Sequence, residues 1–72
     1  MTITLRVHPY ESAAICQQLL VTHGVTEVVR MNSTIVLHCL DHQVPVLLAW
    51  FTLLLLEGKA LSFFVYKEVT ID

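Results

Sequence analysis

The sequence predicts a small α+β domain in which four strands form one antiparallel sheet and two helices cover one face of it. Two segments, residues 2–8 and 60–71, alternate between apolar and polar side chains as half-buried strands do. Two others, residues 9–23 and 45–57, each begin at a proline and are followed by a glycine, as helices often are. A two-residue link, Asn32-Ser33, separates two further strand-like runs. Together these observations indicate the order βαββαβ.

The first strand and helix follow from residues 2–23. Apolar residues occupy alternate positions of the strand, and Pro9 suits a first helical position because its missing N–H is not needed there. Gly24 then suits a left-handed helix cap. The helix residues expected to point inward are Ala14, Ile15, Leu19 and either Val21 or Leu20.

The second half of the prediction rests on β-branched and aromatic residues. Residues 25–31 and 34–40 both contain several β-branched residues, and the short link between these runs predicts a hairpin. The last strand, residues 60–71, is expected to divide its side chains between two faces. The inner face holds Leu61, Phe63, Val65, Val69 and Ile71, and the outer face holds Ser62, Phe64, Tyr66, Glu68 and Thr70.

These elements have one compact arrangement that satisfies the usual connection rules. Each βαβ crossover is right-handed, and the hairpin joins the two βαβ units antiparallel. Interleaving the units gives a two-layer sandwich of the ferredoxin-like, split βαβ type. Residues 1–72 are expected to form this single domain, and a swapped or otherwise wound α+β sheet is the alternative.

The segment Pro45–Glu57 is apolar at almost every position, and Thr52 is its one uncharged polar residue. A helix that is apolar all round is normally buried on all sides or lies in lipid. The run Val44–Leu56 has 13 residues, too short for a bilayer span of about 20. On helical spacing Val46, Leu47, Trp50 and Leu54 are expected to hold the sheet. Leu48, Leu55 and Leu56, on the opposite face with Thr52, are expected to lack a partner within the chain.

Composition narrows the classes of function. Charged residues make up 14% of the chain against an ordinary share of about 25%, which predicts a surface partly covered by another chain. The four basic residues are scattered, so nucleic-acid binding is not expected. No signal-peptide pattern opens the sequence. Cys16 and Cys39 do not make a disulfide framework, so we expect buried free thiols in a cytoplasmic protein.

One short segment collects residue types that bind metals, namely His38, Cys39, Asp41 and His42. Neighbouring residues of a strand point to opposite faces, and no second Cys or His pair follows with the spacing of a zinc site. A strand that ends in a polar turn therefore explains the segment better. We predict no catalytic residue, no metal and no cofactor.

The sequence therefore predicts a small non-catalytic protein–protein interaction or regulatory module, acting as a homo-oligomer, such as a dimer, or docking on a larger protein. Two surfaces are candidates for the interface, and their residues are Leu48, Thr52, Leu55 and Leu56 on the second helix and Phe64 and Tyr66 on the open sheet face. Aromatic residues on such a face can stack nucleobases, but the basic, glycine-flanked motifs of RNA-binding sheets are missing. Two alternatives stay open: an ACT-like domain that senses a small molecule, and a compact inhibitor from a mobile element that blocks one target protein.

Overall fold

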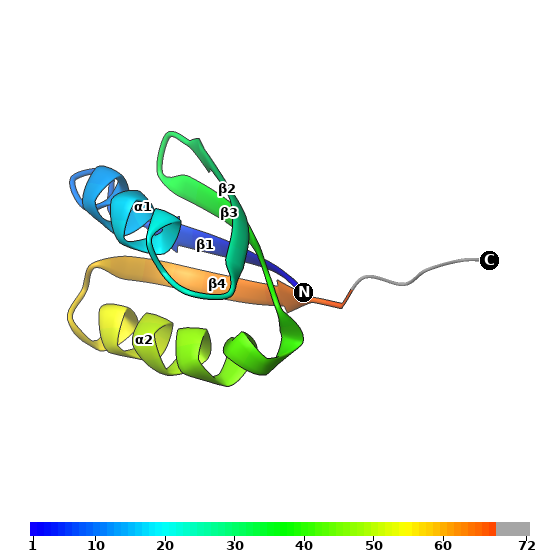
Figure 1. Ribbon diagram of the computed structural model, residues 1–72. Helices are drawn as coiled ribbons and strands as arrows, with labels where there is room; N and C mark the ends of the chain where they lie inside the picture. The colour runs from blue at the N-terminus through cyan, green and yellow to red at the C-terminus, as the bar shows by residue number, and fades with distance from the viewer. Residues whose placement is uncertain (68–72) are drawn as a thin grey trace.

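The structure is a computed structural model that describes residues 1–67, and it confirms the βαββαβ order and the ferredoxin-like arrangement (Figure 1). The strands are β1 (Thr2–Val7), β2 (Val25–Met31), β3 (Thr34–Cys39) and β4 (Ala60–Tyr66), and the helices are α1 (Ser12–Leu20) and α2 (Val44–Leu56). A short 3-10 helix, η1 (Asp41–Gln43), leads into α2. The predicted strand positions Glu68, Val69, Thr70 and Ile71 lie outside the described residues.

The sheet has the strand order β2-β3-β1-β4, and every neighbouring pair is antiparallel. The two central strands, β1 and β3, alternate cleanly between buried and partly exposed residues over most of their length. Ile3 of β1 lies opposite Leu37 on one side and Val65 on the other, so one face of the sheet is apolar across three strands. Both helices contribute buried side chains to the core on that face.

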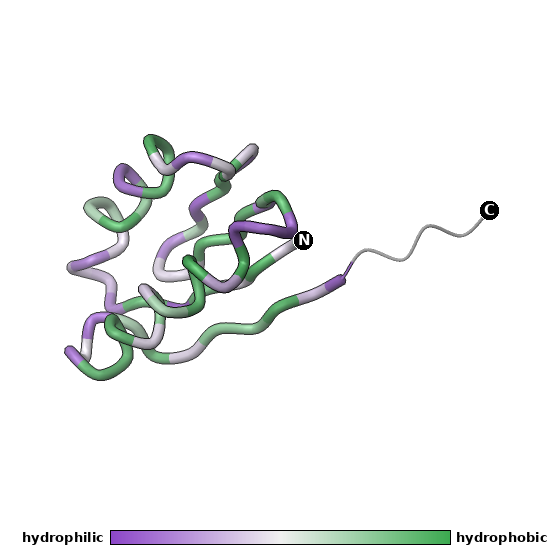
Figure 2. The backbone as a smooth tube through the Cα atoms, turned by 60° about the horizontal axis from the view of Figure 1, so that its bottom comes forward, coloured by the Kyte–Doolittle hydropathy of each residue, from purple (hydrophilic) through white to green (hydrophobic). Residues whose placement is uncertain are grey.

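The core combines the inner sheet face with a few residues from each helix. Its members are Ile3, Leu5, Val7, Ile15, Leu19, Ile35, Leu37, Cys39, Leu47, Phe51, Leu54 and Ala60. Phe51 of α2 is fully buried, and its ring centroid lies 6.0 Å from that of Phe63 on β4. Hydrophobic residues nevertheless run along α2 from one end to the other (Figure 2). The core therefore uses only part of the apolar surface of this helix.

Helix α1 begins at Ser12, three residues later than predicted, because residues 9–11 form a turn. The Glu11 amide donates to the His8 carbonyl in that turn, at 2.8 Å. Ala14 was predicted to point inward, together with either Val21 or Leu20, but all three are exposed, which corrects the prediction. The inner face of the helix instead follows the spacing of Ser12, Ile15 and Leu19, all of which are buried. Leu20 and Val21 come at the end of the helix, beyond the part that packs on the sheet.

The side chains that α2 turns toward the sheet match the prediction in part. Val46, predicted to hold the sheet, is 57% exposed, whereas Phe51 takes the central buried position. Leu48 and Leu55, predicted to lack an intrachain partner, are half-buried and pack against the core. Leu47 and Leu54 are buried and Trp50 packs against the core, as predicted, so Val46 is the one predicted sheet-facing residue that is wrong. A helix that is apolar on every side gives no signal that separates Val46 from its buried neighbours. No helix within residues 1–67 is long and apolar enough to span a membrane.

A β-bulge at the start of β4 corrects one further assignment. Val7 pairs with Ala60 while the preceding residue, Arg6, pairs with Ser62, so Leu61 is the extra residue. The bulge shifts the alternation of the strand by one position. Ala60 is consequently buried, and Leu61, predicted to face inward, is 58% exposed.

The predicted hairpin between β2 and β3 is confirmed. Met31 pairs with Thr34 across the Asn32-Ser33 link, and Asn32 has the positive φ of 55° that a tight hairpin demands. Gly24 has a positive φ of 86°, but α1 ends at Leu20 with Val21 as its C-cap, so the prediction that Gly24 caps this helix was wrong. A side chain at this glycine would collide with Gln43 of η1, whose Nε2 donates to the His23 carbonyl. Gly24 is thus needed both for its backbone conformation and for close contact with η1.

Candidate interaction surfaces

Exposed hydrophobic residues are as numerous as core residues in the described part of the chain. Twelve large hydrophobic residues are exposed and twelve hydrophobic residues form the core. Isolated exposed hydrophobic residues are ordinary, but contiguous ones mark interaction sites. Seven of the twelve fall on two surfaces: Val46, Leu53 and Leu56 on α2, and Val29, Met31, Phe64 and Tyr66 on the sheet.

The first surface is the outer face of α2, which we define as its six exposed residues: Pro45, Val46, Ala49, Thr52, Leu53 and Leu56. None of them is charged, although solvent-facing helix positions ordinarily carry charged residues. Val46 and Leu53 are 57% and 55% exposed, and Leu56 is 79% exposed. The hydroxyl of Thr52, the one polar group, donates to the Leu48 carbonyl at 2.7 Å. This face therefore has no side-chain group that needs water.

The second surface is the open sheet face, on the side away from the helices. The strand register arranges it in three rows, each ordered from β2 to β4. The rows are Glu27, His38, Thr2 and Tyr66; then Val29, Val36, Thr4 and Phe64; then Met31, Thr34, Arg6 and Ser62. The middle row contains no charged residue. The charged residues of this face, Glu27 and Arg6, lie in the outer two rows.

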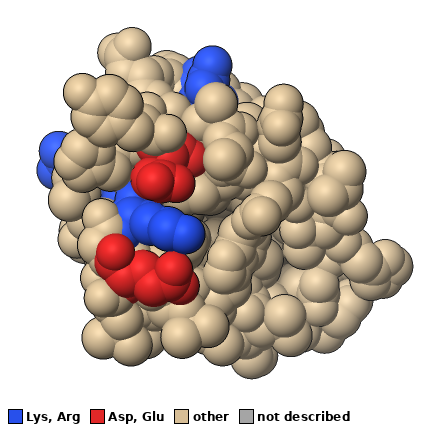
Figure 3. Space-filling model, turned by 90° about the vertical axis from the view of Figure 1, so that its left-hand side faces the viewer, with Lys and Arg blue, Asp and Glu red and all other residues tan. Residues whose placement is uncertain are grey.

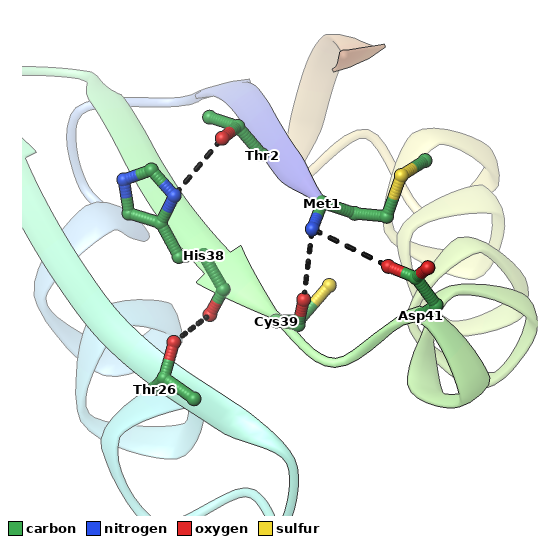
Figure 4. A network of polar contacts seen from close by, with 6 residues as sticks. All are labelled: Met1, Thr2, Thr26, His38, Cys39 and Asp41. Carbon is green, nitrogen blue, oxygen red and sulfur yellow. Dashed lines mark hydrogen bonds and ion pairs between the residues drawn. The ribbon is translucent and has the colours of Figure 1, made fainter. Parts of the chain in front are cut away.

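A polar network links His38, in the first row of the open sheet face, to Thr2 and Thr26 (Figure 4). His38 Nδ1 lies 2.9 Å from Thr2 Oγ1, and His38 Nε2 lies 3.9 Å from a carboxylate oxygen of Glu27. The Thr26 hydroxyl donates to the His38 carbonyl at 3.2 Å. Three neighbouring strands are thus linked through one histidine.

The Cys39 and Asp41 side chains of the candidate metal segment do not join His38 (Figure 4). Cys39 is buried in the core, whereas His42 is exposed in η1. A carboxylate oxygen of Asp41 lies 3.6 Å from the terminal ammonium nitrogen of Met1, which also donates to the Cys39 carbonyl at 3.0 Å. Within residues 1–67, no three His, Cys, Asp or Glu side chains come together in a way that could hold a metal ion.

The two cysteines are free and differ in burial, because Cys39 is buried as predicted and Cys16 is only half-buried. Burial raises the pKa of the Cys39 thiol above its ordinary value, and the nearby Asp41 carboxylate raises this pKa further. The terminal ammonium acts in the opposite direction. Because the thiolate is the nucleophilic form, Cys39 is poorly suited to covalent chemistry at neutral pH.

The described cations are dispersed over the molecule. Arg6 lies on the open sheet face, Arg30 Nη1 lies 3.4 Å from Ser12 Oγ, and Lys59 Nζ lies 3.3 Å from a carboxylate oxygen of Glu57. On the face drawn in Figure 3 the charged side chains are few, and most of the surface is uncharged. Phosphate-rich ligands are bound by concentrated positive charge, which this face does not offer.

The structure distributes the six predicted interface residues over three places. Thr52 and Leu56 lie on the outer face of α2, and Phe64 and Tyr66 lie on the open sheet face. Leu48 and Leu55 instead pack against the core.

Sequence reasoning missed Val46 and Leu53 as exposed residues of α2. The signal that marks them is the position of the less hydrophobic residues of the helix. Pro45, Ala49 and Thr52 recur at helical spacing, so they lie on one side of α2, and that side is the outer one.

No known protein family, curated protein or solved structure matches this chain. The function must therefore be argued from the chemistry of its own surfaces.

Proposed function

We propose that this protein is a small, non-catalytic protein–protein interaction module that acts as a homo-oligomer or docks on a larger protein. The observation that carries the proposal is the outer face of α2, where three large aliphatic residues are more than half exposed and no residue is charged. The open sheet face adds a second apolar area around Phe64 and Val29.

The size of the hydrophobic effect supports association. Burying a whole leucine or valine side chain is worth roughly 1.5–3 kcal/mol, so the exposed parts of Val46, Leu53 and Leu56 represent about 1–2 kcal/mol each. A domain of this length has a free energy of unfolding of roughly 4–11 kcal/mol. Covering these three side chains would therefore contribute about 3–6 kcal/mol per chain, which offsets part of the entropic cost of association.

The remaining chemistry fits a binding role. Cys39 is buried with a raised pKa, and His38 is engaged by its neighbours on the open sheet face. The two free thiols also fit a reducing compartment such as the cytoplasm, which is where we place the protein.

Sedimentation velocity over micromolar to hundred-micromolar concentrations tests the proposal, together with affinity capture from the native cell. We expect species heavier than the 8.2 kDa chain, a stoichiometric partner, or both. A parallel experiment uses a variant with Leu53→Lys and Phe64→Lys, which places a charge on each surface. A wild-type chain that stays monomeric, and captures nothing that this variant does not, would exclude an interaction role.

A further inference from the structure

We infer that the outer face of α2 binds a second copy of this chain, with the two α2 helices packed antiparallel about a two-fold axis. The inference rests on the proposed function and assigns to it one surface and one partner. Four residues form the contact line, which we call the α2 seam: Val46, Ala49, Leu53 and Leu56.

The spacing of the α2 seam is that of a helix–helix interface. Its residues follow one another at intervals of three, four and three, which is the a/d repeat of coiled coils. All four are exposed, so nothing in the described chain already fills the position of the second helix. An a/d line of aliphatic residues is the pattern by which one helix inserts side chains between those of another.

The α2 seam is complementary to itself in antiparallel orientation. A two-fold axis at the level of residue 51 places Val46 opposite Leu56 of the partner and Ala49 opposite Leu53 of the partner. A smaller residue then meets a larger one at every level, as close packing requires. Parallel pairing would instead place Ala49 opposite Ala49 of the partner and leave a gap. Antiparallel helix dipoles also attract, whereas parallel ones repel.

Desolvation favours α2 over the open sheet face as the self-association surface. A sheet-to-sheet contact would remove Glu27 and Arg6, both exposed, from water, and burying charges without compensating contacts is unfavourable. The α2 seam has no charge, and the Thr52 hydroxyl beside it is already satisfied by the Leu48 carbonyl.

The position of α2 leaves room for a second copy. The helix runs beside β4 at the margin of the molecule, with no other part of the described chain beyond it (Figure 1). Thirteen residues give a helix of about 20 Å. A contact of this length buries an area at the low end of specific interfaces, below about 1,200 Å² in total. The expected dimer is therefore reversible, with a dissociation constant in the micromolar range.

Matched lysine substitutions test which surface is used. Leu53→Lys and Leu61→Lys place the same charge at side chains that are 55% and 58% exposed, on α2 and on the β4 bulge respectively. Phe64→Lys does the same on the open sheet face, where Phe64 is 56% exposed. We expect Leu53→Lys to raise the dissociation constant at least tenfold and the other two to change it less than threefold. Circular dichroism and thermal unfolding verify that each variant is folded.

Disulfide trapping tests the orientation and does not depend on the lysine variants. Ala49→Cys and Leu53→Cys are made separately, each with Cys16→Ser, and one carries a tag that changes its mass. Mild oxidation of the mixture should give mainly a dimer that contains one copy of each variant. In the antiparallel arrangement, a cysteine at position 49 faces position 53 of the partner. Parallel pairing would give dimers of each variant alone in equal or greater yield.

The possible outcomes separate this inference from the proposed function. Loss of dimerisation with Phe64→Lys but not Leu53→Lys overturns the inference and leaves an interaction module that uses its sheet. Trapping of like with like overturns the antiparallel geometry. A wild-type chain that stays monomeric overturns the inference, while capture of a different protein in that case would still support the proposed function.

Discussion

Two neighbouring leucines of α2 provide a direct test of how the helix is rotated. Leu54 is 5% exposed and belongs to the core, whereas Leu53 is 55% exposed. Replacing either by alanine makes the same change in helix propensity, within the same turn. Any difference in stability between the two variants therefore arises from how deeply each leucine is buried.

The expected magnitudes are well separated. Truncating a buried leucine to alanine lowers the free energy of unfolding by about 2–5 kcal/mol, because transfer and cavity terms add. For a chain of this size that is a large part of a total of roughly 4–11 kcal/mol, and each 1 kcal/mol corresponds to about 4–8 °C in Tm. Leu54→Ala should thus lower Tm by about 10 °C or more. Leu53→Ala should lower the free energy of unfolding of the monomer by less than about 1 kcal/mol.

Urea unfolding followed by far-ultraviolet circular dichroism measures the free energy of unfolding of each variant, and thermal unfolding measures its Tm. The experiment is repeated after tenfold dilution, because any loss from weakened self-association depends on concentration and any loss from the core does not. Equal losses for the two variants, or a larger one for Leu53→Ala, would show that α2 is rotated from the position described and would remove the basis for the α2 seam.

Two further predictions follow from particular contacts. Gly58→Ala should lower the free energy of unfolding by about 1–2 kcal/mol, because alanine is strained at positive φ. Gly24→Ala should lower it further, because only at Gly24 would the new side chain collide with Gln43. Thermal unfolding of both variants measures the two losses, and equal losses would argue against the Gln43 contact. Burial raises the pKa of the folded Cys39 thiol above its ordinary 9.0, so the unfolded chain loses this proton first and stability falls as pH rises above that value. The advantage of the wild type over Cys39→Ala in urea unfolding should accordingly be smaller at pH 10 than at pH 7, and an unchanged difference would contradict a buried thiol.

Most of the fold could be predicted from the alternation of apolar and polar residues in the strands and from the residues that favour turns. The hairpin at Asn32-Ser33 and the glycines after each helix encode their conformations locally, so the order of elements could be read directly. Right-handed crossovers then left few ways to assemble the sheet. The late start of α1 reflects a local turn at residues 9–11 that Pro9 alone did not reveal. The bulge at Leu61 depends on pairing with β1, which the sequence of β4 alone does not show.

The candidate surfaces were harder to predict than the fold. The low charge of the chain indicated uncovered apolar surface, and Leu56, Phe64 and Tyr66 are exposed as the interface prediction requires. The prediction for α2 was right for Leu47 and Leu54 but wrong for Val46, because hydrophobicity is nearly uniform around the helix. What fixes the orientation is shape, since the large ring of Phe51 occupies the centre of the core.

The bulged strand β4 has a consequence for how the chain behaves when it unfolds. β4 forms an outer edge of the sheet, and its seven residues include no charge and no proline. Natural edge strands usually carry charged residues, prolines or bulges, which prevent pairing with other chains. Of these features, β4 has only the bulge at Leu61. An uncharged segment of this length with high β-propensity is also a typical nucleus of amyloid-like aggregation. Heating should therefore lead to aggregation that light scattering detects and that accelerates with protein concentration, so refolding is best attempted from dilute solution.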